Sequence, residues 1–104
     1  ISIDGCQITD WPSFYQVFSD AFGFPAFFGH SMDAWIDCMT NLDEEFNRVQ
    51  IKQGELVCIN IEQAAVFKAK SPKQYQELIE CAAFVNWRRL EIGEPPILIL
   101  AFNA

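Results

Sequence analysis

Three short apolar runs, separated by longer segments of helical periodicity, constrain the fold of this chain most strongly. Residues 1–8, 55–61 and 97–102 are rich in apolar and β-branched side chains over a length typical of β-strands. Each segment between them has the length and pattern for two helices. Strands that alternate with helices favour parallel pairing through right-handed crossovers. The sequence therefore predicts one α/β domain over residues 1–104, a three-stranded, mainly parallel sheet packed with about four helices.

The third run, ILILAF at 97–102, is apolar at every position. A continuous run of this kind is typical of a strand covered on both faces, so we expect it to be the central strand. The run at 55–61 predicts a second buried strand. In the first run, the turn-prone pair Asp4-Gly5 is expected to interrupt the strand.

Start and stop signals delimit the four expected helices. The first is predicted to open at Pro12, a residue favoured at the first helical position, and to end at Gly23. Ser31 is the expected N-cap of the second helix, and Ser71 that of the fourth. The third is expected over residues 62–70.

Helical spacing also predicts which side chains of these helices face the core. In the third helix the pattern runs through Ala65, Val66 and Ala69. Trp35 in the second helix is assigned to the core. The expected inward residues of the fourth helix are Tyr75, Leu78, Ile79, Ala82, Ala83 and Trp87.

The helix after Ser31 has two separate faces. At about 100° per residue, its apolar residues share one side. A stripe of polar residues lies well away from them. The apolar set is Met32, Trp35, Ile36, Met39, Leu42 and Phe46, and the stripe is Asp33, Asp37, Thr40 and Glu44.

The stripe lacks compensating charge nearby in the sequence. Residues 1–47 contain eight acidic residues and no Lys or Arg, whereas residues 48–104 contain six acidic and seven basic residues. The N-terminal half therefore carries all of the net charge of −7. Two interpretations remain open: the stripe is a solvated helix face, or it is an unpaired acidic patch to which a basic partner supplies the missing charge.

The same charge excludes some classes of partner. An acidic surface repels nucleic acid phosphates and anionic lipids, and it attracts cationic proteins. We therefore expect no direct binding to nucleic acid or to a membrane. No signal peptide and no apolar stretch of about 20 residues is recognisable, so a cytoplasmic protein is expected.

The four cysteines do not form a metal or disulfide pattern. Cys6, Cys38, Cys58 and Cys81 are far apart and lie in apolar stretches, which predicts free, buried thiols. His30 with Asp33 and Asp37 would be a sparse metal site, and Cys38 has no recognisable general base. We therefore expect no metal, no cofactor and no catalytic residues. A small metal- or thiol-dependent enzyme remains a minor alternative.

Several of these segments resemble the barstar family of ribonuclease inhibitors. The similarity lies in IDGCQI at residues 3–8 and PAFFGHSMDAWIDCM at 25–39, followed by the Ser71-Pro72 helix opening with Trp87 downstream. The resemblance covers essentially the whole chain, and 25–38 is its most specific part. It implies the barstar fold and a protein that blocks the active-site cleft of a small ribonuclease.

The resemblance also implies a set of partner-binding residues. Asp37 would take the place of a substrate phosphate, and Asp33 would support it by contacting basic groups. Phe27 and Phe28 stand where the family often has Tyr, and Ser31 stands where Asn is usual. The full expected set is Phe27, Phe28, Gly29, His30, Ser31, Asp33, Ala34, Asp37, Thr40, Glu44 and Glu80. The expected partner is a basic ribonuclease or ribonuclease toxin domain, with a different basic toxin such as a deoxyribonuclease as the alternative.

Overall fold

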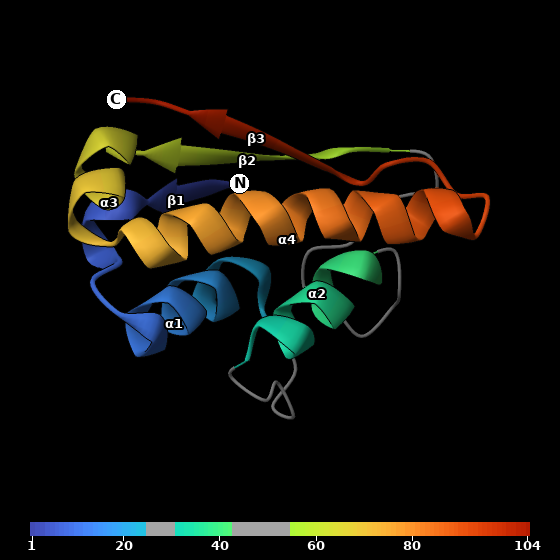
Figure 1. Ribbon diagram of the computed structural model, residues 1–104, viewed down its shortest axis with the longest axis horizontal. Helices are drawn as coiled ribbons and strands as arrows, with labels where there is room; N and C mark the ends of the chain where they lie inside the picture. The colour runs from blue at the N-terminus through green and yellow to red at the C-terminus, as the bar shows by residue number, and fades with distance from the viewer. Residues whose placement is uncertain (25–30, 43–54) are drawn as a thin grey trace.

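The computed structural model describes residues 1–24, 31–42 and 55–104, and Figure 1 shows how their elements are arranged. In this described part, three strands and four α-helices form an α/β fold, as predicted. The elements in chain order are β1 (Ser2–Asp4), the short 3₁₀ turn η1 (Gly5–Gln7), α1 (Trp11–Phe22), α2 (Met32–Thr40), β2 (Val57–Glu62), α3 (Ala64–Lys70), α4 (Pro72–Glu91) and β3 (Leu98–Phe102).

The strands form one parallel sheet in the order β1-β2-β3. Ile3 of β1 lies opposite Ile61 of β2, and Ile59 of β2 lies opposite Leu100 of β3. The central strand is therefore β2, and the prediction that residues 97–102 form the central strand is wrong. The order of strands depends on long-range pairing, which an apolar run does not encode.

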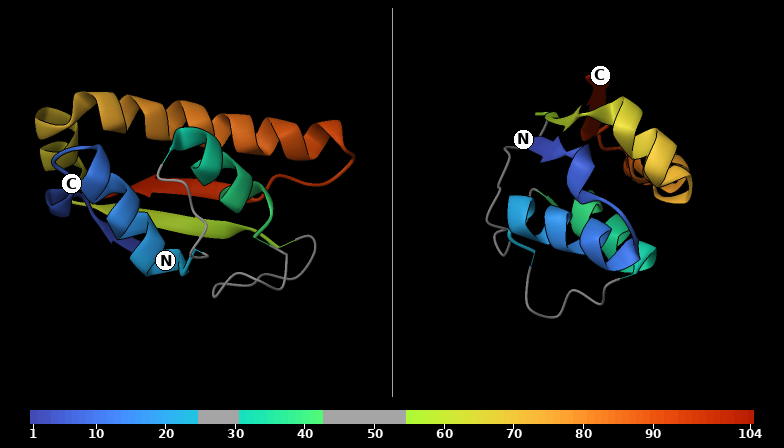
Figure 2. Two further views of the ribbon diagram at one scale, coloured as in Figure 1. Left: turned by 90° about the horizontal axis from the view of Figure 1, so that it is seen from below. Right: turned by 90° about the vertical axis from the view of Figure 1, so that its left-hand side faces the viewer.

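In the described part of the chain, one face of the sheet is not covered by helices. Along β2, Val57, Ile59 and Ile61 are buried, whereas Cys58 and Glu62 are exposed. Helices α1, α2 and α4 all lie on the buried side (Figures 1 and 2). The expectation that residues 97–102 are covered on both faces is therefore wrong: Ile99 and Phe102 are exposed, and the described helices α1, α2 and α4 lie on the other side of the sheet (Figure 2).

The first helix begins with a reciprocal cap. The Asp10 carboxylate accepts a hydrogen bond from Ser13 N at 2.9 Å, and the Ser13 hydroxyl accepts one from Asp10 N at 3.0 Å. This capping box starts α1 at Trp11, one residue before Pro12. The helix ends at Gly23, whose φ of 65° is readily available to glycine. Both predicted ends are therefore confirmed to within a residue.

The start of α4 is anchored to the beginning of the chain. Ser71 occupies the predicted N-cap position, but its hydroxyl donates to Ile8 O at 2.9 Å instead of capping the helix.

The buried residues of α3 are Ala64 and Phe67. Ala65 and Ala69 are exposed, so the prediction that they face the core is wrong. The end of β2 and α3 pass so close to Gly5 that a β-carbon there would lie 2.7 Å from Glu62 O and 2.8 Å from the Phe67 β-carbon. Only glycine fits this contact.

Helix α4 is the long central element beside the sheet. Its buried residues include Leu78 and Ala82, as predicted, and also Val85, which was not predicted. Ile79, Ala83 and Trp87 are exposed, so their predicted inward placement is wrong. Around the helix, Ile79 lies about 100° from Leu78. Ala83 and Trp87 lie about 100° and 140° from Ala82. All three are beyond the face that the sheet and the other helices cover. Among the described residues, no helix is long and apolar enough to cross a membrane.

Candidate partner-binding surface

Helix α2 begins at the predicted N-cap. The Ser31 hydroxyl accepts a hydrogen bond from Ala34 N at 3.1 Å, which satisfies one of the free donors of the first turn. Asp33 lies in this first turn, where the positive end of the helix dipole favours a carboxylate. No residue in the described part of the chain forms a hydrogen bond or ion pair with the exposed Asp33 side chain. Asp33 is therefore free to accept hydrogen bonds from another molecule.

The opposite side of α2 is fixed in the core. Trp35 is fully buried, with its ring centroid 5.6 Å from that of Phe18 and 6.5 Å from that of Phe14. Because Asp33 and Asp37 are four residues apart, they share the side that faces solvent. The prediction that these two aspartates lie on an exposed face is confirmed.

Thr40 does not belong to this exposed face. It is buried, and its hydroxyl donates to Ile36 O at 2.6 Å. Its expected place on the acidic stripe is wrong: Thr40 is the last residue of α2, at the end that packs against α4, where Arg89 donates a hydrogen bond to its carbonyl. The other predicted residues Glu44 and Phe27, Phe28, Gly29 and His30 lie outside the described residues.

A buried cation fastens the end of α2. Arg89 of α4 donates through Nη1 to Thr40 O at 3.1 Å and through Nε to Pro95 O at 3.5 Å. The Thr40 carbonyl lies at the C-terminal, negative end of the α2 dipole, where a cation is favourable. Sequence reasoning missed this role; the only signal was a pair of basic residues near the end of a helix.

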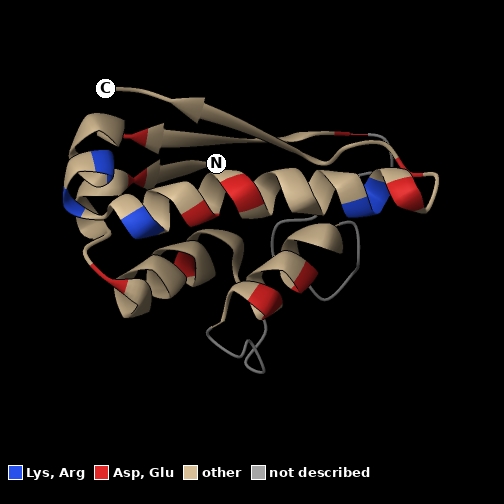
Figure 3. Ribbon diagram, viewed as in Figure 1, with Lys and Arg blue, Asp and Glu red and all other residues tan. Residues whose placement is uncertain are grey.

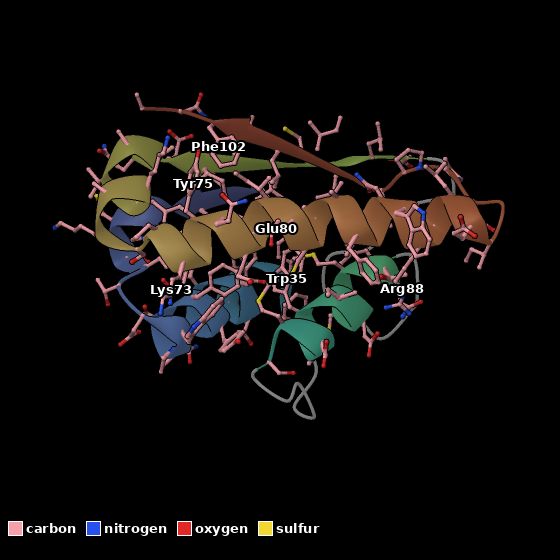
Figure 4. The ribbon with its side chains drawn as sticks, in the orientation of Figure 1. Trp35, Lys73, Tyr75, Glu80, Arg88 and Phe102 are labelled. Atoms are coloured by element: carbon pink, nitrogen blue, oxygen red, sulfur yellow. The ribbon has the colours of Figure 1, made fainter. Side chains whose placement is uncertain are left out.

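Arg88, the residue before Arg89 in α4, forms an ion pair with Asp37 on the exposed face of α2. Arg88 Nη1 lies 3.0 Å from Asp37 Oδ1, and the two side chains are 38% and 66% exposed. Figure 3 shows the basic residues in the last turns of α4, and in Figure 4 Arg88 points from α4 toward α2. The expectation of an unpaired stripe is therefore wrong for Asp37. Its partner is 51 residues away in the sequence, so no local pattern could have revealed it.

Acidic groups from two helices converge beside Cys81. Its thiol donates to Glu77 Oε2 at 3.6 Å. Burial, together with the negative charges of Glu77, Glu80 and Asp33, raises the pKa of the Cys81 thiol to about 11. Glu80 is exposed and accepts a hydrogen bond from Gln76 at 3.0 Å. The predicted residues Glu80 and Asp33 thus lie on the same side of the molecule.

The four cysteines are free thiols that differ in burial. Cys38 and Cys81 are buried, whereas Cys6 and Cys58 are exposed, so the prediction of four buried thiols is half wrong. Burial, with a smaller contribution from Asp37, also raises the pKa of Cys38. Neither buried thiol has the lowered pKa of a nucleophilic cysteine.

We expect iodoacetamide at pH 8 to alkylate Cys6 and Cys58 well before Cys38 and Cys81. A raised pKa leaves less thiolate at this pH, and burial limits access. Peptide mapping by mass spectrometry over a time course measures the order. Rapid alkylation of Cys38 or Cys81 in the folded protein would support the thiol-enzyme alternative.

The two aspartates lie on an exposed helix face and not in a cavity. A pocket of about 370 Å³ lies at the starts of α1 and α4, lined by Trp11, Pro72, Lys73, Gln76 and Glu77, and neither aspartate reaches it. Among the described residues, no three His, Cys, Asp or Glu side chains are arranged to hold a metal. An exposed acidic helix face is suited to binding basic groups in the cleft of another protein.

A comparison with protein families agrees with this architecture. The family described as Barstar (barnase inhibitor) matches residues 1–98. The chain belongs to the barstar family. The match includes the whole of α2 and α4, and therefore every candidate residue of the acidic surface. Barstar-family proteins are inhibitors that bind ribonucleases such as barnase, and they are not enzymes. No curated protein matches the chain.

Proposed function

We propose that this barstar-family protein inhibits a basic ribonuclease by placing the outward face of α2 in its active-site cleft. The observation that carries the proposal is the pair Asp33 and Asp37, one turn apart and exposed on a helix whose other face is buried. The family match supports the same class of partner.

The chemistry of a ribonuclease cleft suits these two groups. Such a cleft needs Arg and Lys to bind phosphate, and these side chains also donate strong, charge-assisted hydrogen bonds to carboxylates. Asp37 takes the place of a substrate phosphate, and Asp33 contacts neighbouring basic groups. Ser31, the N-cap of α2, and Ala34, in its first turn, are proposed as contacts beside Asp33.

The fold holds the acidic face in a binding-ready position. The Ser31 cap fixes the start of α2, the Trp35 ring fixes its middle, and Arg89 fixes its end. A preorganised surface loses less conformational entropy on binding than a flexible one. The loop residues Phe27, Phe28, Gly29 and His30, together with Glu44, stay predicted contacts.

Arg88 adds a step to this proposal. In the free protein it occupies one oxygen of the Asp37 carboxylate, so the cation of the ribonuclease replaces or joins it. The pair is largely exposed, and exposed ion pairs contribute only about 0–1 kcal/mol. Breaking this ion pair on binding therefore costs little free energy. The positive charge of Arg88 also makes the local potential less negative, which weakens the attraction of the basic ribonuclease.

We expect Arg88→Gln to raise the association rate constant about two- to threefold at low salt, because it frees Asp37 and removes a positive charge beside it. Lys73→Gln is the matched control, since it removes one charge from the opposite end of α4 (Figure 4). Stopped-flow mixing with barnase at several salt concentrations measures both. Slower association of Arg88→Gln would mean that Arg88 itself contacts the ribonuclease.

The proposed function is tested by titrating barnase activity with the protein and measuring association at increasing ionic strength. We expect stoichiometric loss of ribonuclease activity and an association rate that falls as salt rises. A basic deoxyribonuclease is the comparison, because an acidic helix alone does not distinguish the two enzymes. Inhibition of the deoxyribonuclease alone, or a salt-independent association rate, would contradict the proposal.

A further inference from the structure

Two aromatic rings on α4 are exposed beside each other. Phe84 is 45% exposed and Trp87 is 53% exposed. Their ring centroids are 5.6 Å apart, with an angle of 31° between the ring planes. Single exposed apolar residues are common, but paired large aromatic rings on a surface are typical of binding sites.

The pair borders the acidic face of α2. Arg88 follows Trp87 directly, and it lies one helical turn after Phe84 on the same side of α4. Its guanidinium reaches Asp37 at 3.0 Å. The aromatic pair and the Asp37 carboxylate are therefore parts of one continuous surface formed by two helices.

Carboxylates flank the pair along α4 itself. Glu80 lies one turn before Phe84, and Glu91 lies one turn after Trp87, and both are exposed. An aromatic face with carboxylates nearby favours a cationic side chain, most of all a planar guanidinium, which can stack on the ring and pair with the acid.

We propose that Phe84 and Trp87 form a second half of the partner-binding surface and contact the same basic ribonuclease that α2 enters. This inference rests on the proposed function. The Phe84–Trp87 pair receives an arginine or lysine from the rim of the cleft, while Asp33 and Asp37 occupy its centre. A surface of this kind commonly contains a few aromatic residues that contribute most of the binding energy.

The charge of the chain disfavours a second copy as the occupant. Two molecules meeting through this surface would bring Glu80, Glu91 and Asp37 of one copy against the same groups of the other. With a net charge of −7 on each chain, the two copies repel each other. A basic partner instead meets complementary charge.

The test measures association and dissociation of barnase with Phe84→Ala and Trp87→Ala. We expect each variant to dissociate about tenfold faster or more, with an association rate within about twofold of wild type, because neither change alters charge. Trp87→Phe should recover much of the lost lifetime. Phe102→Ala is the matched control: it truncates another exposed aromatic residue, at the opposite end of the molecule from Arg88 (Figure 4).

The possible results separate this inference from the proposed function. Unchanged dissociation of Trp87→Ala, with binding lost on substitution of Asp33 and Asp37, would overturn the inference alone. A wild-type dimer in sedimentation velocity that Trp87→Ala converts to monomer would assign the surface to a second copy and also overturn it. Absence of any binding between wild type and barnase would overturn both proposals.

Discussion

The double variant Asp33→Asn, Asp37→Asn is expected to lose inhibition of the ribonuclease while remaining folded. Removing one partner of a charge pair that becomes buried in a complex costs about 2–5 kcal/mol. Two such losses raise the dissociation constant on the order of a thousandfold or more. Both side chains are exposed in the free protein, so the free energy of unfolding should change by only about 0.5–1 kcal/mol.

Glu62→Gln provides the control for loss of negative charge. Glu62 is exposed at the end of β2, on the face of the sheet that no described helix covers, away from α2. Inhibition titrations of barnase with the single variants, the double variant and this control would show how much of the loss of inhibition each aspartate causes. Equal inhibition by the double variant and wild type would show that the acidic stripe is only a solvated helix face.

Trp35→Ala should lower the free energy of unfolding by about 3–5 kcal/mol, the usual cost of removing a large aromatic side chain from a core. Trp35 is fully buried against Phe14 and Phe18. The free energy of unfolding of a small domain is about 5–15 kcal/mol, so this substitution would remove a large part of it. The same variant loosens α2 and thus the position of Asp33 and Asp37.

Trp87→Ala is the matched control for this stability measurement, because it truncates the same residue type at an exposed position. We expect a change of within about 0.5 kcal/mol. Urea denaturation followed by far-ultraviolet circular dichroism measures both variants. Equal destabilisation by the two substitutions would contradict the assignment of Trp35 to the core and Trp87 to the surface.

Trp35→Phe separates packing from hydrogen bonding at this position. The indole Nε1 of Trp35 is buried, and no group in residues 1–24, 31–42 or 55–104 accepts a hydrogen bond from it. Its ring therefore stabilises α2 through packing, and phenylalanine removes the unpaired donor while keeping an aromatic ring. The loss of stability should be clearly smaller for phenylalanine than for alanine.

Local signals in the sequence predicted the order of the elements and the ends of several helices. The Ser31 cap and the Gly23 terminus depend on atoms within a few residues of each other, so the sequence suffices to predict them. The outward position of Asp33 and Asp37 follows from helical periodicity and the buried side chains beside them. These features lie within single elements.

Contacts between distant elements decided the features that the sequence did not predict. The apolar run at 97–102 became the edge strand β3, because strand order depends on which strands pair across the sheet. Trp87 and Cys58 lie on faces that no described helix or strand covers. An apolar or aromatic residue at helical or strand spacing shows which side it lies on, but not what packs against that side.

The two adjacent arginines of α4 show this division at the candidate site. The sequence predicted a long helix that contains Arg88 and Arg89, but it did not show which groups their side chains would contact. In the folded chain, Arg88 reaches the exposed Asp37 carboxylate, whereas Arg89 is buried against the Thr40 carbonyl. They lie about 100° apart around the helix, so one points to solvent and the other into the junction of α2 and α4. The sequence by itself determined the acidic helix, and only tertiary packing decided which cation pairs with it, because that cation comes from a helix about fifty residues away.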